Sequence, residues 1–307
     1  MGKNFLNLDE KLRGALKGKV VVVTGAGSGL GKAISFGLPF AGAKIGCLDL
    51  NEKAVQEVSS KINTEFPNSS LPLIASVTDE VQLEKAYSDL QKHFGSIDVL
   101  VNCAGIARLG AINELLPKDI RFSNDVNLNG YFLNASIASR HMIETHKKKG
   151  PENGCSIINI SSASARGASE NSSLYGVSKE AQCMMARSWA VDLGKYGIRV
   201  NTLLAGDLYG DPALGIESGI WNQQYFEKKA IDKGLIKTDD PRLGGEHLNP
   251  EIRKMVIDYY AKRTALGKQI TYMDVIELIV LLCSDLCSKI TGESIPITAG
   301  NPTVFSR

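Results

Sequence analysis

The chain has 307 residues, of which 43% are hydrophobic and 22% charged, and this balance suits a globular protein with a large buried core. Its formal net charge of +2 excludes the strongly basic surface that binds nucleic acid or anionic membranes. The first residues, MGKNFLNLDEKLRG, lack the apolar stretch of a secretory signal, and no segment approaches the ~20 apolar residues of a membrane helix. We therefore expect a cytoplasmic protein with no nucleic-acid or membrane partner.

From residue 19 onward, short β-branched apolar runs alternate with longer segments of helical periodicity. The expected strands are VVVVT (20–24), 44–50, 71–77, 97–102, 156–161, 198–204 and 293–298. The expected helices span 29–42, 52–66, 79–94, 117–146 and 174–196. This alternation predicts an α/β fold: a doubly wound parallel β-sheet of about seven strands, covered by helices on both faces, with ligands at the carboxyl ends of the strands.

We expect residues 1–18 to be an N-terminal extension and residues 19–307 to form one domain. Residues 207–270 interrupt the alternation after the sixth strand, with an aromatic patch around Trp221 and Tyr225 and a further helix at 251–263. A segment this long between two core elements is usually functional, so we expect a substrate lid. Its basic residues either meet a phosphate or carboxylate or are ordinary solvated charges: Arg242, Lys262, Arg263 and Lys268.

A glycine cluster, TGAGSGLG, occupies residues 24–31 directly after the first expected strand. Glycines let the chain turn sharply and approach a pyrophosphate, whose charge would lie at the N-terminus of the helix that opens near Ser28. Asp49, at the end of the second strand, can bind both ribose hydroxyls of NAD and would repel the 2′-phosphate of NADP. The pattern therefore predicts NAD in preference to NADP. The alternative is a set of turn glycines followed by a helix-capping aspartate.

Six cysteines are scattered without a Cys-x-x-Cys pair, and the four histidines show no metal-binding spacing. We therefore expect free thiols, no disulfide and no bound metal.

Tyr175 and Lys179 lie four residues apart in SSLYGVSKEA, which places their heads on one helix face. A second such pair, Tyr225 and Lys229, shows that the spacing alone is not specific. A phenol must have its pKa shifted from about 10 toward 7 to exchange protons at neutral pH. An ammonium about 4 Å away, at an effective dielectric near 20, would supply roughly 4 kcal/mol, or about three pKa units. We expect Tyr175 to be a general acid/base with Lys179 lowering its pKa.

In their order along the chain, these motifs resemble those of the short-chain dehydrogenase/reductase family, from Lys19 to Gly300. The family's TGxxxGxG, NNAG, VNxxG and YxxxK patterns appear at 24–31, 102–105 (with Cys103 in the second place), 126–130 and 175–179. Ser162 lies 13 residues before Tyr175, whereas Pro212 occupies the equivalent position before Tyr225. Context therefore favours Tyr175 over Tyr225.

The resemblance implies a Rossmann-type oxidoreductase domain whose catalytic residues are Asn127, Ser162, Tyr175 and Lys179. It also implies that Lys179 holds the nicotinamide ribose and that Asn127 holds a water linking Lys179 to solvent. Ser162 follows the fifth strand, so it can hydrogen-bond the substrate oxygen, although a serine there is more often a cap or turn residue.

The cofactor-binding residues indicated by the turn, the strand ends and the resemblance are Gly25, Ser28, Gly29, Leu30, Gly31, Asp49, Leu50, Ser76, Val77, Asn102, Ala104, Gly105, Tyr175, Lys179, Gly206 and Leu208. Ser76 replaces the family's usual aspartate before the adenine-side residue Val77. After the sixth strand, Ala205 and Gly206 replace Pro-Gly, and Gly210 replaces a threonine. These departures weaken the expected contacts to the adenine and the carboxamide.

The motifs together predict an NAD-dependent oxidoreductase that interconverts a secondary or small alcohol and its carbonyl. Residues 218–221, 262–264 and 298–301 resemble the family's sugar and polyol branch, which implies a sugar, polyol or sugar-phosphate substrate. Two alternatives remain open: an NAD-binding sensor without turnover, and an epimerase that recycles bound NAD. The resemblance implies a homotetramer or homodimer through the Tyr175 helix, whose apolar stripe (Met184, Met185 and Trp189) core packing would explain equally well.

Overall fold

The fold is seen in a computed structural model that describes residues 10–150, 154–168, 170–211, 215–216 and 222–304. Pro212, Trp221 and the rest of the 218–221 motif lie outside the described residues, as do residues 1–9 of the segment at 1–18.

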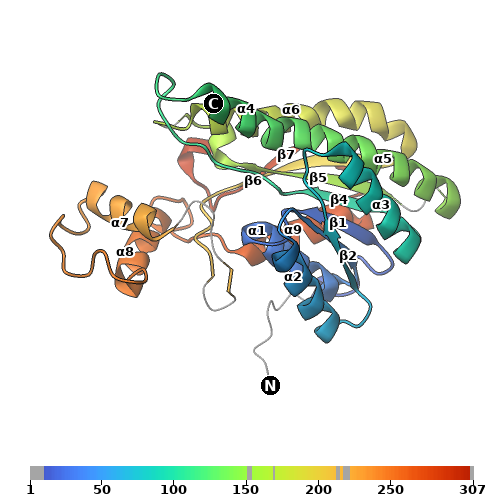
Figure 1. Ribbon diagram of the computed structural model, residues 1–307, viewed down its shortest axis with the longest axis horizontal. Coiled ribbons are helices and arrows are strands. Elements are labelled where there is room, and N and C mark those ends of the chain that lie inside the picture. Colours follow the sequence, from blue (N-terminus) through green and yellow to red (C-terminus); the bar gives the residue numbers. More distant parts are fainter. Residues whose placement is uncertain (1–9, 151–153, 169, 212–214, 217–221, 305–307) are drawn as a thin grey trace.

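A parallel sheet of seven strands forms the centre of the molecule (Figure 1), in the order β3-β2-β1-β4-β5-β6-β7. Its strands are β1 Val20–Thr24, β2 Lys44–Asp49, β3 Ser70–Ile74, β4 Val99–Asn102, β5 Cys155–Ser162, β6 Ile198–Ala205 and β7 Ser294–Ile297. The strand order reverses direction between β1 and β4, and ligands bind such sheets beside the carboxyl ends at this switch point. The expected α/β fold is confirmed.

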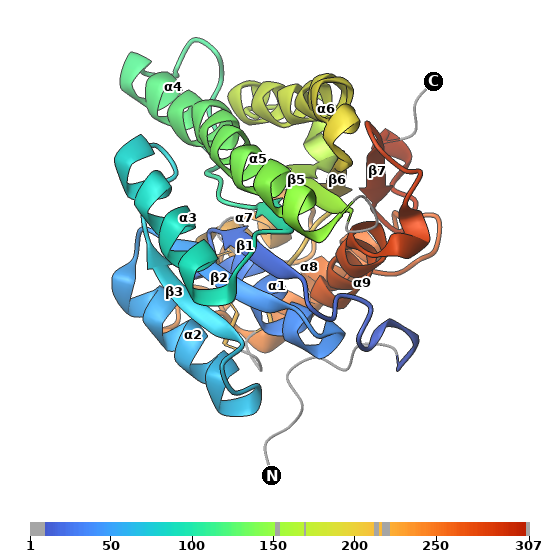
Figure 2. The same ribbon diagram turned by 90° about the vertical axis from the view of Figure 1, so that its right-hand side faces the viewer.

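Helices cover both faces of the sheet (Figure 2). Their bounds are α1 Gly29–Gly37, α2 Glu52–Glu65, α3 Glu80–Phe94, α4 Pro117–Asn124, α5 Gly130–Lys149, α6 Ser173–Leu193, α7 Gln223–Asp232, α8 Pro250–Ala261 and α9 Tyr272–Cys283. The apolar cores place α1, α2 and α9 against one face and α3, α5 and α6 against the other. β1 and β6 are buried at every position, so their residues do not alternate between apolar and polar; β1 in particular is an unbroken run of valines that ends at Thr24.

The helix expected at 117–146 is divided in the structure. α4 ends at Asn124, a π-helical turn spans Asp125–Asn129, and α5 begins at Gly130. A π turn inside a helix carries an extra residue and often occurs at functional sites. Here it buries Asn127 completely while Asp125 stays exposed, so it directs Asn127 toward the centre of the molecule.

The segment after β6 forms a small lobe, which we define as the described residues between 207 and 270 (Figure 1, α7 and α8). It has its own apolar cluster, made of Tyr209, Phe226, Ala230, Ile236, Ile252, Val256 and Ile257. The guanidinium of Arg253 ties α8 to the start of the lobe by donating to the carbonyl oxygens of Gly210 at 2.8 Å and Tyr209 at 3.3 Å. The helix expected at 251–263 is confirmed as α8, whereas α7, and α9 after the lobe, were not predicted.

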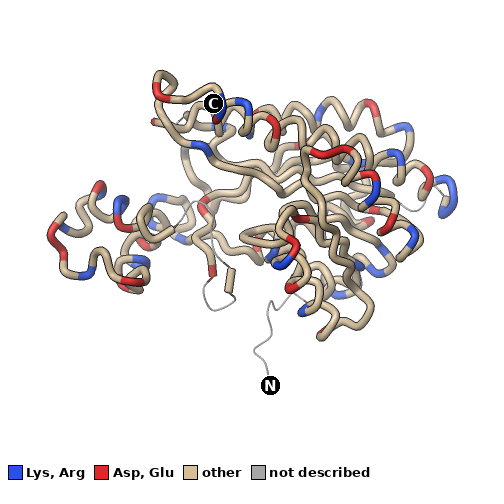
Figure 3. The backbone as a smooth tube through the Cα atoms, in the orientation of Figure 1, with Lys and Arg blue, Asp and Glu red and all other residues tan. Residues whose placement is uncertain are grey.

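Charged residues of both signs are interspersed along the chain (Figure 3), in keeping with the small net charge. Within the described residues, no helix is both long and apolar enough to span a bilayer. The same part of the chain holds no group of three or more His, Cys, Asp or Glu side chains placed to bind a metal ion. All six cysteines are free thiols.

Candidate functional site

The glycine-rich turn after β1 is packed too closely for side chains. Gly25 has a φ of +70°, and a Cβ there would lie 2.9 Å from Ala104 Cα. A Cβ on Gly31 would lie 2.2 Å from the carbonyl oxygen of Gly25. Thr24 Oγ1 accepts hydrogen bonds from the amides of Cys103 and Ala104, both at 3.0 Å. The turn is therefore fixed against the loop after β4 and requires glycine at positions 25 and 31.

The N-terminus of α1 is open toward this turn. Ser28 is the N-cap residue, and its side chain makes no capping hydrogen bond. The first amides of a helix, here from Gly29 to Gly31, have no partner within the helix, so they can bind an anion. Leu30 packs partly against the core beneath them.

Asp49 is held beside the same turn. Its Oδ2 accepts from the amide of Gly27 and its Oδ1 from the amide of Asn51, both at 2.9 Å. A Cβ on Gly27 would lie 3.0 Å from the Asp49 carboxylate, so the missing side chain is what allows this approach. Each carboxylate oxygen keeps a lone pair for a further donor. The next residue, Leu50, is exposed.

Tyr175, Lys179 and Ser162 come together at the carboxyl end of β5. The hydroxyl groups of Tyr175 and Ser162 are hydrogen-bonded. Lys179 is 4% exposed, and its Nζ lies 5.5 Å from the centroid of the Tyr175 ring and donates to the carbonyl oxygen of Ile160 at 2.9 Å. Ser162 also caps the short turn that follows, since its Oγ accepts from the amide of Ser164 at 3.2 Å. The serine thus has both the site position and the capping role considered from the sequence.

The electrostatics of the pair differ from the expectation. Burial raises the pKa of Tyr175 to about 12, although the hydrogen bond from Ser162 lowers it. Burial also lowers the pKa of Lys179 to about 8. The expectation that the lysine brings the phenol toward 7 is wrong for this structure, because the ammonium is directed to the Ile160 carbonyl and desolvation of the phenolate dominates.

Asn127 lies beside this group, with its side chain fully engaged. Its Oδ1 accepts from the amide of Ile106, and its Nδ2 donates to the carbonyl of Ile106 and to Ser178 Oγ, at 2.9, 2.9 and 3.1 Å. Its own carbonyl oxygen accepts from Gln182 Nε2 at 3.1 Å. A Cβ on Gly105 would lie 3.4 Å from Asn127 Oδ1 and 3.5 Å from Lys179 Nζ, so the loop after β4 passes directly over both.

The other expected cofactor residues lie around the same edge, several of them in structural roles. Asn102 Nδ2 donates to Asn159 Oδ1 at 3.1 Å and so joins β4 to β5. Val77 packs against Gly130 at the start of α5, where a Cβ would lie 3.0 Å from Val77 Cγ2. Ser76 is a turn residue whose Oγ is hydrogen-bonded to Thr78 Oγ1 at 2.9 Å. Beyond β6, the amide of Gly206 donates to the carbonyl of Ile297 at 2.9 Å, and Leu208 packs against the core.

The second tyrosine–lysine pair lies in the lobe. Tyr225 and Lys229 are both on α7, with Lys229 Nζ 5.0 Å from the Tyr225 ring centroid. Of the lobe's basic residues, Arg242 is already paired with Asp240 and Glu251, each at 2.8 Å. Arg263 donates to the Tyr259 hydroxyl at 3.1 Å, whereas Lys262 and Lys268 are exposed.

Two site residues were missed from the sequence. Gln182 is completely buried and hydrogen-bonded to Lys179, and its signal was a polar residue on the lysine's own helix, three positions further on. Asp207 directly follows Gly206, and its charge acts on both Tyr175 and Lys229. Asp207 is exposed in this structure. The signal for Asp207 was an acidic residue at the carboxyl end of a buried strand.

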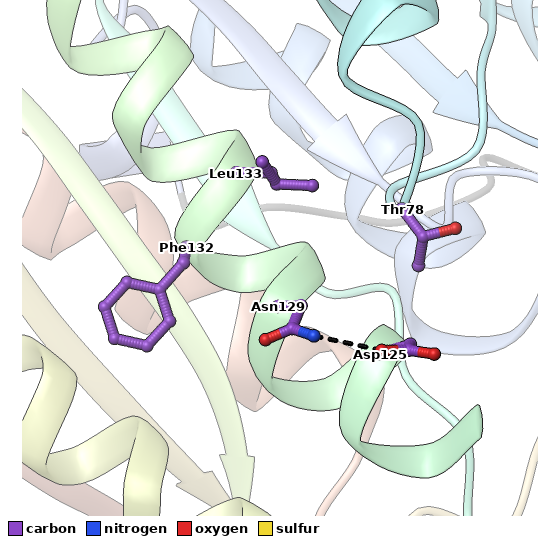
Figure 4. Close-up of a pocket in the computed structure, with 5 residues that line it drawn as sticks. All are labelled: Thr78, Asp125, Asn129, Phe132 and Leu133. Atoms are coloured by element: carbon purple, nitrogen blue, oxygen red, sulfur yellow. Dashed lines mark hydrogen bonds between the residues drawn. The ribbon is translucent and has the colours of Figure 1, made fainter. Parts of the chain in front are cut away.

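A hollow of about 560 Å³ lies elsewhere, on the outer side of the π turn (Figure 4). It is lined by Thr78, Asp125, Asn129, Phe132 and Leu133, none of which was an expected site residue. Asn129 Nδ2 donates to Asp125 Oδ1 across one wall at 2.9 Å. Asn127 and Asp125 thus lie on opposite sides of the π turn: Asn127 is buried, and Asp125 lines the exposed hollow.

Comparison with known proteins gives matches over most of the chain. Residues 19–212 match the family model described as short chain dehydrogenase. The chain is 30% identical to sorbitol-6-phosphate 2-dehydrogenase of Escherichia coli (strain K12) over 283 residues, which cover 92% of this chain and 98% of that enzyme. It is 29% identical over 290 residues to an uncharacterized oxidoreductase, YuxG, of Bacillus subtilis (strain 168); the match covers 94% of this chain but 38% of that longer protein.

Among solved structures, an NAD+-bound xylitol dehydrogenase superposes with a TM-score of 0.76 at 24% identity, covering 93% of this chain and 99% of that one. At this identity the likeness supports the fold alone.

Proposed function

Because this chain belongs to the short-chain dehydrogenase/reductase family, we propose that it is an NAD-dependent oxidoreductase that interconverts a secondary alcohol of a polyol-type substrate and the corresponding carbonyl. The observation that carries the proposal is the meeting of Ser162, Tyr175 and Lys179 at the carboxyl end of β5. A protein that only sensed the dinucleotide would need the turn and Asp49 but not these three side chains.

The residues around the turn fit a dinucleotide. The space beside Gly25 and Gly31 admits no side chain, which lets backbone approach a pyrophosphate, and the first amides of α1 face the same side. Asp49 keeps lone pairs for two ribose hydroxyls, and its negative charge opposes a 2′-phosphate, which supports NAD over NADP. Lys179 retains a free N–H for the second ribose. When bound, the nicotinamide supplies the hydride acceptor or donor.

The chain's own residues handle the proton. At neutral pH the phenol of Tyr175 is protonated, since its pKa is about 12, so it is ready to donate a proton to a carbonyl oxygen and to take one back from an alcohol. The Ser162 hydroxyl, bonded to the same phenol, can donate to that oxygen as negative charge develops on it. Lys179, with a pKa of about 8, is still charged at pH 7 and stabilises the phenolate that proton donation leaves behind.

The region of Asp207 supports a hydroxyl-rich substrate. Asp207 follows the end of β6 by two residues, where Ala205 pairs with Ser162, and it begins the lobe, so we propose that its carboxylate lies between the catalytic group and the lobe. A carboxylate accepts hydrogen bonds from hydroxyl groups and repels anions. We therefore propose that the lobe acts as a substrate lid and that the reacting end of the substrate is an uncharged polyol. A phosphate, if the substrate carries one, would lie at the distal end near Lys262 or Lys268.

The test is a screen of NAD+ and NADP+ against polyols and polyol phosphates, followed by absorbance of the reduced nicotinamide. We expect Tyr175→Phe to lose at least about 100-fold in kcat while still binding NADH, because only the proton donor is removed. Tyr225→Phe is the matched control, since that tyrosine has the same lysine spacing but lies in the lobe, and it should stay within a few-fold of wild type. Binding of NADH with no turnover of any substrate would favour the sensor alternative. Isomerisation without net reduction of NAD+ would favour the epimerase.

We also propose that the protein forms a homodimer or homotetramer through α5 and α6. Phe132, Val177, Met184 and Val191 are exposed on these helices, whereas Met185 and Trp189, which the sequence placed on the same stripe, are buried in the core. Sedimentation of Val191→Lys should show a smaller species than wild type. Val81→Lys, on the outer side of α3, should leave the assembly unchanged; equal effects of the two changes would argue against this interface.

A further inference from the structure

Gln182 joins two parts of the catalytic group. Its side chain is completely buried on α6. Its Oε1 accepts a hydrogen bond from Lys179 Nζ at 3.2 Å, while its Nε2 donates to the carbonyl oxygen of Asn127 at 3.1 Å. The hydroxyl of Tyr131, which donates to the Ile160 carbonyl at 3.0 Å, is also hydrogen-bonded to this amide. One side chain thereby connects α6, α5 and the π turn before α5.

We propose that Gln182 is a positioning residue that orients the Lys179 ammonium and keeps it charged, and that its amide links Lys179 to the Asn127 carbonyl. The catalytic meaning of this inference rests on the proposed function. The contact itself does not, because it is a property of the folded chain.

The hydrogen-bond inventory of the ammonium supports this role. Lysine has three N–H donors, and the Ile160 carbonyl and Gln182 Oε1 accept two of them. The third is left for the open side of the site, so the two acceptors determine where it points. Burial disfavours the charged lysine, and each acceptor offsets part of that penalty. An amide neither gains nor loses a proton near neutral pH, so Gln182 orients the lysine without relaying its proton.

The titratable side chains around Lys179 are uncharged near its titration midpoint, so Gln182 is the residue to change in a test. Cys103, from the loop after β4, and Cys183, on α6, act on the lysine electrostatically. The rings of Tyr131, from α5, and Tyr175, on α6, have their centroids 5.7 and 5.5 Å from Nζ. Burial raises the pKa of all four groups, so each is neutral at pH 8, and β5 contributes only the Ile160 carbonyl.

The experiment measures the titration of Lys179 directly, by NMR of the folded protein with 13C at lysine Cε. Lys179→Met assigns the signal, which should titrate well below the other lysines. Gln182→Met keeps the length of the side chain but removes its acceptor, so the midpoint should fall by about one unit or more. Gln182→Glu places a carboxylate beside the ammonium, so the midpoint should rise by about one to three units.

Opposite shifts in these two variants support the inference, and a Lys179 midpoint equal to wild type in both would overturn it. Gln91→Met removes a half-buried glutamine of α3 whose amide is hydrogen-bonded to His141 and Glu144 on α5, and so controls for loss of a glutamine at a distant site. If Gln182→Met does not fold, the Lys179 midpoint in Gln182→Glu is the test: a rise supports the inference and an unchanged value overturns it. Where the protein turns over an alcohol, the alkaline limb of kcat should move in the same directions. If the Lys179 midpoint shifts but the alkaline limb of the kcat–pH profile does not, Gln182 has no role in catalysis. Absence of any turnover would count against the proposed function only.

Discussion

Replacing Lys179 by methionine should change how the stability of the protein depends on pH. Lys179 is almost fully buried, and its pKa falls from 10.5 to about 8 on folding. Below pH 8 the lysine is charged in both the folded and unfolded chains, and the folded state bears the cost of burying that charge. Between pH 8 and 10.5 the unfolded chain binds the proton and the folded chain does not. Since stability rises with pH wherever the unfolded state binds more protons, this lysine adds stability across that window.

The magnitude follows from the width of the window. Each unit of pKa difference corresponds to about 1.4 kcal/mol, so raising the pH from 7 to 10 should stabilise wild type relative to Lys179→Met by about 2–3 kcal/mol. Contributions from the other titrating groups cancel in the difference between the two proteins. The constant cost of leaving the Ile160 carbonyl and Gln182 without their donor cancels as well, because it is present at both pH values.

The assay is urea unfolding of both proteins at several pH values from 7 to 10, analysed as free energies of unfolding. The prediction concerns the slope of the difference, not its absolute value. A difference that stays constant across this range would mean that Lys179 does not titrate near pH 8, and a difference that moves in favour of the methionine variant as pH rises would reverse the sign of the reasoning.

Two further predictions concern the dinucleotide site. Asp49→Asn should improve the use of NADP+ relative to NAD+ by about tenfold or more, because it removes the charge that opposes a 2′-phosphate; kcat/KM ratios for the two cofactors measure this, and an unchanged ratio would contradict the assignment. Gly31→Ala should weaken NADH binding strongly and lower the free energy of unfolding by about 1–3 kcal/mol, since the new Cβ would lie 2.2 Å from the Gly25 carbonyl oxygen. Gly194→Ala, where the added methyl meets open space, should leave both NADH fluorescence titrations and unfolding curves near wild type.

Most of the fold could be predicted because short apolar runs alternate along the chain with segments of helical periodicity. β1 is buried at every position, and it therefore begins and ends where VVVVT does. The division of the helix at 117–146 could not be predicted, because the π turn at Asp125–Asn129 keeps helical periodicity on either side. Tertiary contacts, including the hydrogen bonds from Asn127 to Ile106, accompany that extra residue. The helix α7 was missed because its apolar residues pack within the lobe rather than on the sheet.

The proximity of Tyr175 and Lys179 could be predicted from the sequence, but the pKa values of the two groups could not. The i, i+4 spacing along α6 correctly predicted that Lys179 lies beside Tyr175. The spacing does not determine which groups accept hydrogen bonds from the buried ammonium. In the structure those acceptors are the Ile160 carbonyl and Gln182, and the phenol is hydrogen-bonded to Ser162. The sequence argument assumed one charge acting on one phenol, and it omitted the desolvation that both groups undergo.

The order of the two pKa values limits what this pair can do alone. Lys179 loses its proton near pH 8 and Tyr175 near pH 12, so raising the pH of the protein yields a neutral lysine long before it yields a phenolate. An ammonium–phenolate pair therefore forms only when a substrate oxygen takes the tyrosine's proton while the lysine is still charged. Every acceptor on Nζ widens the pH range in which that holds, because it stabilises the charged form. This is why a neutral amide at Gln182, buried at the lysine's side, bears on the proton transfer without taking part in it.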